Sequence, residues 1–202
     1  MDGTLVKEPT LRVLARKLGF LRELDYFDEL LEREEISTAV CLREQFKLFG
    51  GYKASQLLGL VNDVPRIKWI RRTVESFKAQ GLRVIVLSDN MTFLSRFFLP
   101  YGFETTLGSI GVVRRGIFTG EAEIADKKSL PIRKFCRERG LSLSECIHVG
   151  DWNNDIPVFK MVGLSVALNP QNETVTKSAD LLVRSDSLFD VYRKTRPLLQ
   201  GG

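Results

Sequence analysis

Cysteine, histidine and long apolar runs are all scarce in this sequence. Its 202 residues include three cysteines, Cys41, Cys136 and Cys146, and a single histidine, His148. Because the cysteines are widely spaced and odd in number, they argue against a disulfide framework or a closed zinc site, and we expect a reduced, cytoplasmic setting. No segment approaches the roughly 18 uninterrupted apolar residues of a membrane span, and the N-terminus lacks the apolar stretch of a signal peptide. We therefore expect no membrane partner.

Clustered positive charge is also absent, although the net charge is +5. The basic residues alternate with acids, as in Arg137-Glu138-Arg139, and no basic run is interleaved with aromatic residues. This pattern is typical of a solvated surface, so we expect no nucleic-acid partner. The length suits one sizeable domain or a core with a modest insertion, and it does not predict an oligomeric state.

The segment from about Pro9 to Val61 has helical periodicity throughout. Its apolar residues form four short stripes, at Leu11/Leu14/Leu18, Leu24/Phe27/Leu31, Ala39/Leu42/Phe46/Phe49 and Ala54/Leu57/Val61. The first stripe is closed by Gly19 and the third by Gly50-Gly51. Since a short amphipathic helix cannot bury its stripe alone, the four helices should pack together as a small bundle.

After Asp63-Val64-Pro65 the pattern changes to alternating strands and helices. Residues 82–87 predict a buried strand that ends at Ser88-Asp89-Asn90, and residues 104–120 predict short strands with a hairpin. Further strands are expected at 146–149, 164–168 and 181–183, with helices at 67–77, 93–101, 128–139, 156–163 and 188–192. Such alternation indicates a mostly parallel sheet covered by helices, with ligands bound beyond the carboxyl ends of the strands. Ser88 and Asp151 should therefore face the same crevice.

The turn from Gly150 to Asp155 carries two carboxylates, Asp151 and Asp155, where a strand gives way to a helix. Acids at this spacing suit a hard cation. Asp2-Gly3-Thr4, Ser88 and a lysine at 127 or 128 should converge on the same crevice. Each element also has a structural explanation: a turn, a helix cap, solvated charges or acids in a helix's first turn. Together they are what a phosphoryl group needs, because its charge must be neutralised before a nucleophile can approach.

These elements, in this order along the chain, resemble the motifs of the haloacid dehalogenase superfamily of phosphatases. The chain is most similar to the phosphoserine phosphatase-like branch of that superfamily. The resemblance covers essentially the whole chain and is most specific in Gly-Asp-x-x-Asn-Asp, residues 150–155, with a lysine 23 residues before Asp151. It implies a Rossmann-like α/β core, formed by residues 1–8 and 65–202, and a helical cap formed by residues 9–64. It also implies a small phosphorylated metabolite as substrate and Mg²⁺ as cofactor.

The resemblance assigns the catalytic and metal-binding roles residue by residue. Asp2 corresponds to the second aspartate of Asp-x-Asp-Gly-Thr, which acts as general acid and then base and places its backbone carbonyl on magnesium. Lys128, matched by spacing in preference to Lys127, would neutralise the phosphate and the nucleophile. Asp151 would ligate magnesium, and Asp155 would hold a metal-bound water or orient its neighbours. His148 is interpreted as a hydrogen-bonded structural histidine.

Phosphate and substrate contacts are implied for four further residues. Gly3 would let a backbone amide meet a phosphate oxygen, Ser88 would hydrogen-bond the phosphate, and Asn154 would contact phosphate or substrate. Asp89 is grouped with them as a substrate-site residue.

The family's nucleophile, an aspartate two positions before Asp2, falls ahead of Met1. Three explanations stay open: a start assigned too late, which we favour, a truncated record, or a pseudo-phosphatase that binds a phosphate ligand or a partner without catalysis. A chain without this aspartate cannot form the aspartyl-phosphate intermediate.

Two substrate-holding positions also differ from the phosphoserine-specific pattern. There a glutamate and a cap arginine hold the amino acid, whereas ungapped matching places Pro9 and Gln45 at those positions, with Glu8 and Arg43 nearby. The sequence thus favours phosphoserine no more than another small phosphomonoester.

Overall fold

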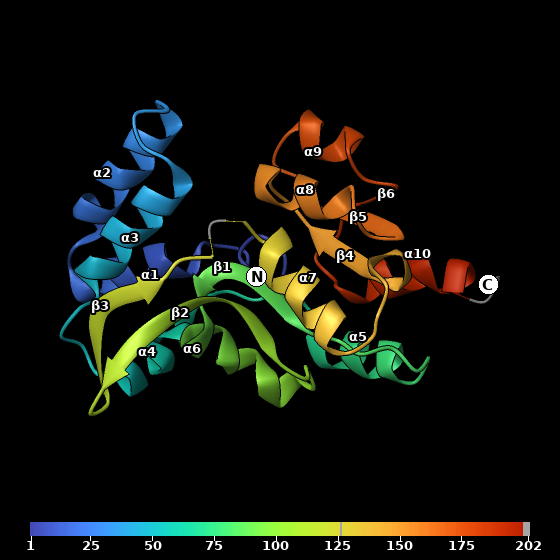
Figure 1. The fold of residues 1–202 in the computed structure, drawn as a ribbon, viewed down its shortest axis with the longest axis horizontal. Coiled ribbons are helices and arrows are strands. Elements are labelled where there is room, and N and C mark those ends of the chain that lie inside the picture. Colours follow the sequence, from blue (N-terminus) through green and yellow to red (C-terminus); the bar gives the residue numbers. More distant parts are fainter. Residues whose placement is uncertain (126, 200–202) are drawn as a thin grey trace.

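The computed structural model describes residues 1–125 and 127–199, and its strands form two three-stranded sheets (Figure 1). The strands are β1 (Val86–Met91), β2 (Thr106–Arg114), β3 (Ile117–Glu123), β4 (Ile147–Gly150), β5 (Leu164–Leu168) and β6 (Leu181–Val183). In the first sheet β1 runs parallel to β2, which forms an antiparallel hairpin with β3. In the second, β4, β5 and β6 are all parallel. The α/β class is confirmed, but the strands expected in one sheet are divided between two.

The helices lie close to the predicted positions. They are α1 (Thr10–Leu18), α2 (Leu21–Glu32), α3 (Thr38–Leu48), α4 (Ala54–Leu60), α5 (Ile70–Lys78), α6 (Thr92–Ser95), α7 (Ser129–Glu138), α8 (Ile156–Phe159), α9 (Glu173–Lys177) and α10 (Phe189–Leu199), with 3₁₀ turns η1 (Val61–Asp63), η2 (Arg96–Tyr101), η3 (Leu143–Glu145) and η4 (Asn153–Asp155). Gly19 ends α1 in the left-handed conformation, which a glycine adopts without strain. Helix α9 was not predicted, and α10 extends beyond the expected 188–192.

Helix α3 packs against β3 of the first sheet, α2 packs on α3, α1 packs on α2, and α4 packs on α6 (Figure 1). The chain between α3 and α4 runs along β3, where the amide of Gly51 donates to the carbonyl of Phe118 (2.8 Å) and that of Ala54 to Gly116 (2.9 Å). Phe46 and Phe49 are fully buried in the same apolar cluster as Phe118. The four predicted helices therefore share a core with the sheet.

The first strand lies further along the chain than the sequence predicted. Leu82–Leu87 was expected to be a buried strand ending at Ser88, whereas β1 begins at Val86 and includes Ser88 to Asn90. Residues 82–85 are outside any strand, and Ile85 and Leu87 are only half-buried. In the described structure the pairing of β1 with β2 begins at Val86. Before it, the amide of Glu104 donates to the carbonyl of Val84 (2.8 Å), and that of Leu82 donates to the carbonyl of Phe77 in α5 (3.2 Å).

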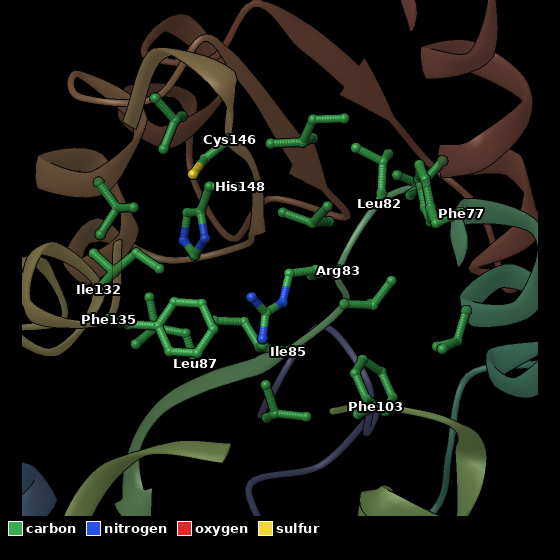
Figure 2. Close-up of a pocket in the computed structure, with 18 of the residues that line it drawn as sticks. Phe77, Leu82, Arg83, Ile85, Leu87, Phe103, Ile132, Phe135, Cys146 and His148 are labelled. Carbon is green, nitrogen blue, oxygen red and sulfur yellow. The ribbon is translucent and has the colours of Figure 1, made fainter. Parts of the chain in front are cut away.

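A cavity of about 450 Å³ lies between β1 and β4 (Figure 2). Helix α7 lines one side through Ile132 and Phe135, and α5 and α10 line the other. Phe77 of α5 and Tyr192 of α10 meet edge to face, with their ring centroids 5.2 Å apart. Among the described helices, none combines the length and apolar character that crossing a bilayer requires.

Close approach of β1 and β2 yields a prediction for Gly108. A Cβ at this position would lie against the backbone carbonyl oxygens of Ser88 and Asn90, at 2.7 Å from the latter. Because backbone cannot rotate away, Gly108→Ala should destabilise the chain by about 2 kcal/mol or more. Gly59→Ala is the matched control, because nothing lies within 4 Å of its Cβ and alanine favours a helix. Urea unfolding measures both, and equal stabilities of the two variants would contradict the prediction.

Candidate active site

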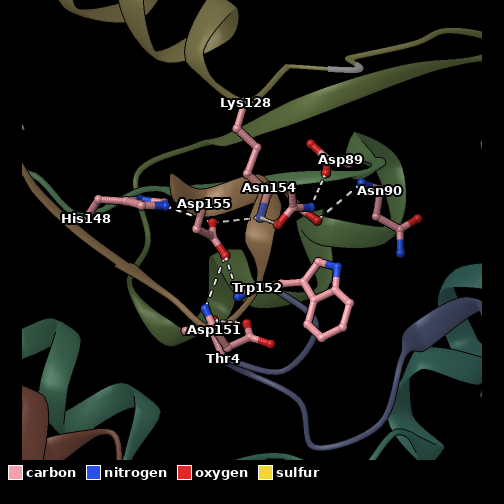
Figure 3. Close-up of polar contacts among 10 residues, drawn as sticks. Thr4, Asp89, Asn90, Lys128, His148, Asp151, Trp152, Asn154 and Asp155 are labelled. Carbon is pink, nitrogen blue, oxygen red and sulfur yellow. Dashed lines mark hydrogen bonds and ion pairs between the residues drawn. The ribbon is translucent and has the colours of Figure 1, made fainter. Parts of the chain in front are cut away.

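The buried carboxylate of Asp155 lies at the centre of the polar residues in Figure 3, and four donors surround it. Its Oδ1 accepts from Nζ of Lys128 (2.7 Å) and lies 2.9 Å from Nε2 of His148. Its Oδ2 accepts the backbone amides of Asp151 (3.1 Å) and Trp152 (3.2 Å). These contacts join the end of β4, the start of α7 and the turn at 150–155.

The charges of this network follow from its contacts. Burial alone would raise the pKa of Asp155, but the bonds from His148 and Lys128 hold it well below its usual range. Burial would likewise lower the pKa of Lys128, yet the carboxylates of Asp155 and Asp89 raise it. Burial lowers the pKa of His148, so its ring is neutral at pH 7 and its Nε2–H donates to Asp155. The result is a buried Lys⁺–Asp⁻ pair oriented by a neutral histidine.

Asp151 occupies the adjacent position at the carboxyl end of β4. Its Oδ1 accepts the hydroxyl of Thr4 (2.9 Å), and burial raises its pKa to about 6. Gly3 lies directly against this carboxylate, since a Cβ on Gly3 would overlap Oδ2 of Asp151. Its φ of 71° also favours glycine. The Gly3-Thr4 pair is thus fitted to Asp151 by a close approach and a hydrogen bond.

Asp2 is held between β1 and the helical segment. Its Oδ1 accepts both the hydroxyl (2.6 Å) and the backbone amide (3.2 Å) of Thr10, the first residue of α1. Its Oδ2 accepts from Nδ2 of Asn90 at 3.5 Å. The positive N-terminal end of α1 therefore faces the Asp2 carboxylate, which suits an anion.

Two of the predicted substrate-site residues, Asn154 and Asp89, lie on the side of Lys128. Nζ of Lys128 donates to Oδ1 of Asn154 (3.1 Å), and Nδ2 of Asn154 donates to Oδ2 of Asp89 (2.5 Å). Oδ1 of Asp89 is buried and has no partner among the described residues, and burial raises the pKa of this carboxyl. Ser88 is buried one residue earlier, where its hydroxyl accepts the amide of Asn90 (3.2 Å).

The residues around Asp151 fit magnesium better than a metal ion that is held by several side-chain ligands. Within residues 1–125 and 127–199, no three His, Cys, Asp or Glu side chains are grouped to hold a metal ion. Magnesium needs only one or two carboxylates, because water and phosphate complete its shell. Oδ2 of Asp151 accepts no hydrogen bond from the described residues, whereas both oxygens of Asp155 do. This favours Asp151 as ligand and Asp155 as the group that orients it.

Sequence reasoning missed the supporting contacts of Thr10, Asn90 and His148. Thr10 directly follows Pro9 at the start of a predicted helix, which is a signal for an anion contact at a helix end. His148 is hydrogen-bonded, as expected, but its partner is the central carboxylate Asp155. All three cysteines are free, as predicted.

The residues near the expected substrate-holding positions have other partners. Glu8 pairs with Arg16, and Arg43 is exposed. Gln45 is buried in α3, where its amide donates to Oδ1 of Asp28 (2.6 Å).

Comparison with known proteins gives a consistent picture. A family model described as haloacid dehalogenase-like hydrolase matches residues 1–160. The phosphoserine phosphatase of Albidiferax ferrireducens is 27% identical over 96% of this chain and 87% of its own length. That of Archaeoglobus fulgidus is 26% identical over 93% of this chain, which spans only 56% of that relative. A solved structure of a substrate-bound phosphoserine phosphatase complex has the same fold, with a TM-score of 0.80, 21% identity and coverage of 96% and 94%.

Removal of the Lys128 charge should strongly destabilise the chain. Lys128→Met would leave the buried Asp155 carboxylate without its cation, at a cost of about 3–5 kcal/mol. Lys127→Met is the matched control, because Lys127 is exposed, and it should change stability by less than about 0.5 kcal/mol. Chemical denaturation at pH 7.5 compares them, and similar losses for both lysines would disprove the assignment of Lys128 to Asp155.

The raised pKa of Asp151 predicts that the difference in stability between Asp151→Asn and the unsubstituted chain depends on pH. Its pKa of about 6 in the folded chain exceeds the ordinary 3.8, so ionisation opposes folding by up to about 3 kcal/mol. This penalty is absent below about pH 4 and complete above about pH 6. Asp151→Asn, which keeps an acceptor for Thr4, should therefore stabilise the chain at pH 7.5 but not at pH 4. Urea unfolding in EDTA measures this, and a gain independent of pH would contradict it.

Proposed function

The chain belongs to the haloacid dehalogenase-like hydrolase family, and we propose that it is a Mg²⁺-dependent phosphatase acting on a small phosphomonoester. The observation that carries this proposal is the shared network of Lys128, Asn154 and Asp155, with Asp151 and Thr4 beside it. It combines a buried cation for a phosphate with a carboxylate that suits magnesium. We further propose that residues 9–64 act as a cap on the core formed by residues 1–8 and 65–202.

Each residue has a definite task in the proposed reaction. A carboxylate oxygen attacks phosphorus and forms an aspartyl-phosphate while the ester P–O bond breaks, and the leaving alcohol takes a proton from Asp2. Water then attacks the same phosphorus and gives a proton to Asp2, and phosphate is released as the acyl-phosphate bond breaks. Lys128 neutralises the phosphoryl charge, while Gly3, Ser88 and Asn154 bind its oxygens and Asp89 lines the substrate side. Magnesium, when bound at Asp151, would further polarise the phosphoryl group.

The attacking carboxylate is proposed to be an aspartate directly before Met1. Met1 is buried close to Lys128, Asp2 and Asp151, whose charges act on its amino group. A residue joined at this nitrogen would therefore start from within the site.

The substrate is proposed only as a small phosphomonoester. The relatives named above are phosphoserine phosphatases, but Gln45 of this chain is committed to Asp28 and Glu8 to Arg16. Gln45 is therefore not an arginine that could bind the carboxylate of phosphoserine. Glu8 is paired with Arg16 and is not free to bind its ammonium group. The reduced cysteines support a cytoplasmic setting.

The test is to join an apolar segment ending in aspartate to Met1 and to assay p-nitrophenyl phosphate with magnesium. The matched control ends in asparagine, and its activity should be lower by about 10³-fold or more, as should that of the 202-residue chain. In the active form Asp151→Asn should reduce activity by about 10-fold to 100-fold at limiting magnesium.

Two outcomes would contradict this proposal. Magnesium-dependent activity of the 202-residue chain, lost in Asp151→Asn, would show that the aspartate before Met1 is dispensable. Equal inactivity of the aspartate and asparagine forms, with phosphate still bound, would favour a phosphate-binding protein without catalysis.

A further inference from the structure

Two of the three free cysteines lie in contact with each other. Sγ of Cys136, in the last turn of α7, is 3.7 Å from Sγ of Cys146, which directly precedes β4. The third cysteine, Cys41 of α3, donates its thiol instead to the carbonyl of Phe27 (3.4 Å). Neither Cys136 nor Cys146 takes part in the proposed phosphatase reaction, so their contact needs a separate explanation.

The chain between these two cysteines folds back on itself and brings them together. The amide of Leu141 donates to the carbonyl of Cys136 (3.0 Å), and the amide of Cys146 donates to the carbonyl of Leu143 (3.0 Å). Gly140, with a φ of 64°, allows the first of these turns at the end of α7. Backbone hydrogen bonds of the connecting segment therefore hold the two thiols, ten positions apart, in contact.

The two sulfur atoms differ in their access to solvent. Cys136 is 3% exposed and belongs to a buried apolar cluster with Ile132 and Phe135, whereas Cys146 packs against this cluster and is half-buried. Figure 2 shows Cys146 at the wall of the cavity, beside His148. A small oxidant therefore reaches Cys146 first, with Cys136 directly behind it.

A disulfide between these residues requires only a small movement. The sulfur atoms of a disulfide are about 2 Å apart, so those of Cys136 and Cys146 would approach each other by about 1.7 Å. Residues 139–145, which connect the two cysteines, are exposed apart from the half-buried Leu143. This segment can adjust its path without disturbing a buried core.

We propose that Cys136 and Cys146 form a reversible intramolecular disulfide when the protein meets a hydroperoxide. Cys146 loses its proton and attacks one oxygen of hydrogen peroxide; the O–O bond breaks, and the departing hydroxide takes up that proton as water. The sulfur of Cys136 then attacks the resulting sulfenic acid; the S–S bond forms, the S–O bond breaks, and the hydroxide leaves with the proton of Cys136 as a second water. Two thiols are oxidised and one peroxide is reduced, and a thiol reductant reverses the change.

The disulfide would tie α7 to β4, which carry Lys128 and Asp151 at their other ends. It would also close a loop of about ten residues and so restrict the unfolded chain. Burial, together with the contact to Cys136, raises the pKa of the Cys146 thiol to about 12. The thiolate is therefore scarce at pH 7 and the oxidation is slow, as suits a response to sustained oxidant in a compartment that otherwise keeps thiols reduced.

The experiment treats the folded 202-residue chain with hydrogen peroxide at pH 8.5 and identifies the linked peptides by mass spectrometry. The chain should lose two hydrogen atoms in one bond between Cys136 and Cys146, and dithiothreitol should restore its mass. The unfolding temperature of the oxidised chain should exceed that of the reduced chain by about 5 °C or more.

Substitution of each cysteine shows where the effect arises. Cys146→Ser and Cys136→Ala should each abolish both the bond and the rise in unfolding temperature, whereas Cys41→Ser, the matched control, should preserve both. Oxygen added to Cys146 without a bond to Cys136, a bond between two chains, or an unfolding temperature that does not rise would overturn the proposal. No readout is enzymatic, so failure here is distinct from failure of the phosphatase proposal.

Discussion

Burial of the Asp155 carboxylate is the constraint on which the candidate site depends. A charge removed from water is costly unless donors replace the lost hydration, and here four N–H groups do so. Those donors come from β4, from the start of α7 and from the turn after β4. The same carboxylate therefore fixes the position of Lys128, the tautomer of His148 and the path of the chain through Asp151. Loss of one donor would disturb all three.

Much of the fold could be predicted from local patterns. The helices α1 to α4 and the strands β5 and β6 follow from apolar spacing and from glycines that end elements. The first strand could not be placed by the same means, because Leu82 to Leu87 are apolar apart from Arg83 and predict a strand along their whole length. A strand needs a pairing partner as well as apolar residues, and in the described structure this run pairs with β2 only from Val86 onward. Whether such a partner exists is a property of the whole sheet.

The sequence predicted which residues lie in the candidate site more fully than it predicted the contacts between them. The structure brings Asp2, Lys128, Asp151, Asn154 and Asp155 into one region, although their catalytic roles stay predictions. Contacts that depend on distance across the fold were beyond sequence reasoning. Asp89 lies 65 positions from Asn154 in the chain and 2.5 Å from it in space. The choice of Asp151 rather than Asp155 as the direct metal ligand also depends on donors that only the folded chain provides.

The double contact between Thr10 and Asp2 links two parts of the molecule that the sequence separates into core and cap. Thr10 is the first residue of α1, so its hydroxyl and amide move with the helical segment. A displacement of α1 by about one ångström would break the 2.6 Å bond and release the carboxylate from its orientation. The position of α1 therefore sets the orientation of the carboxylate for which we propose the proton-transfer role. If residues 9–64 act as a cap, as proposed, a movement of α1 would also change the orientation of the Asp2 carboxylate.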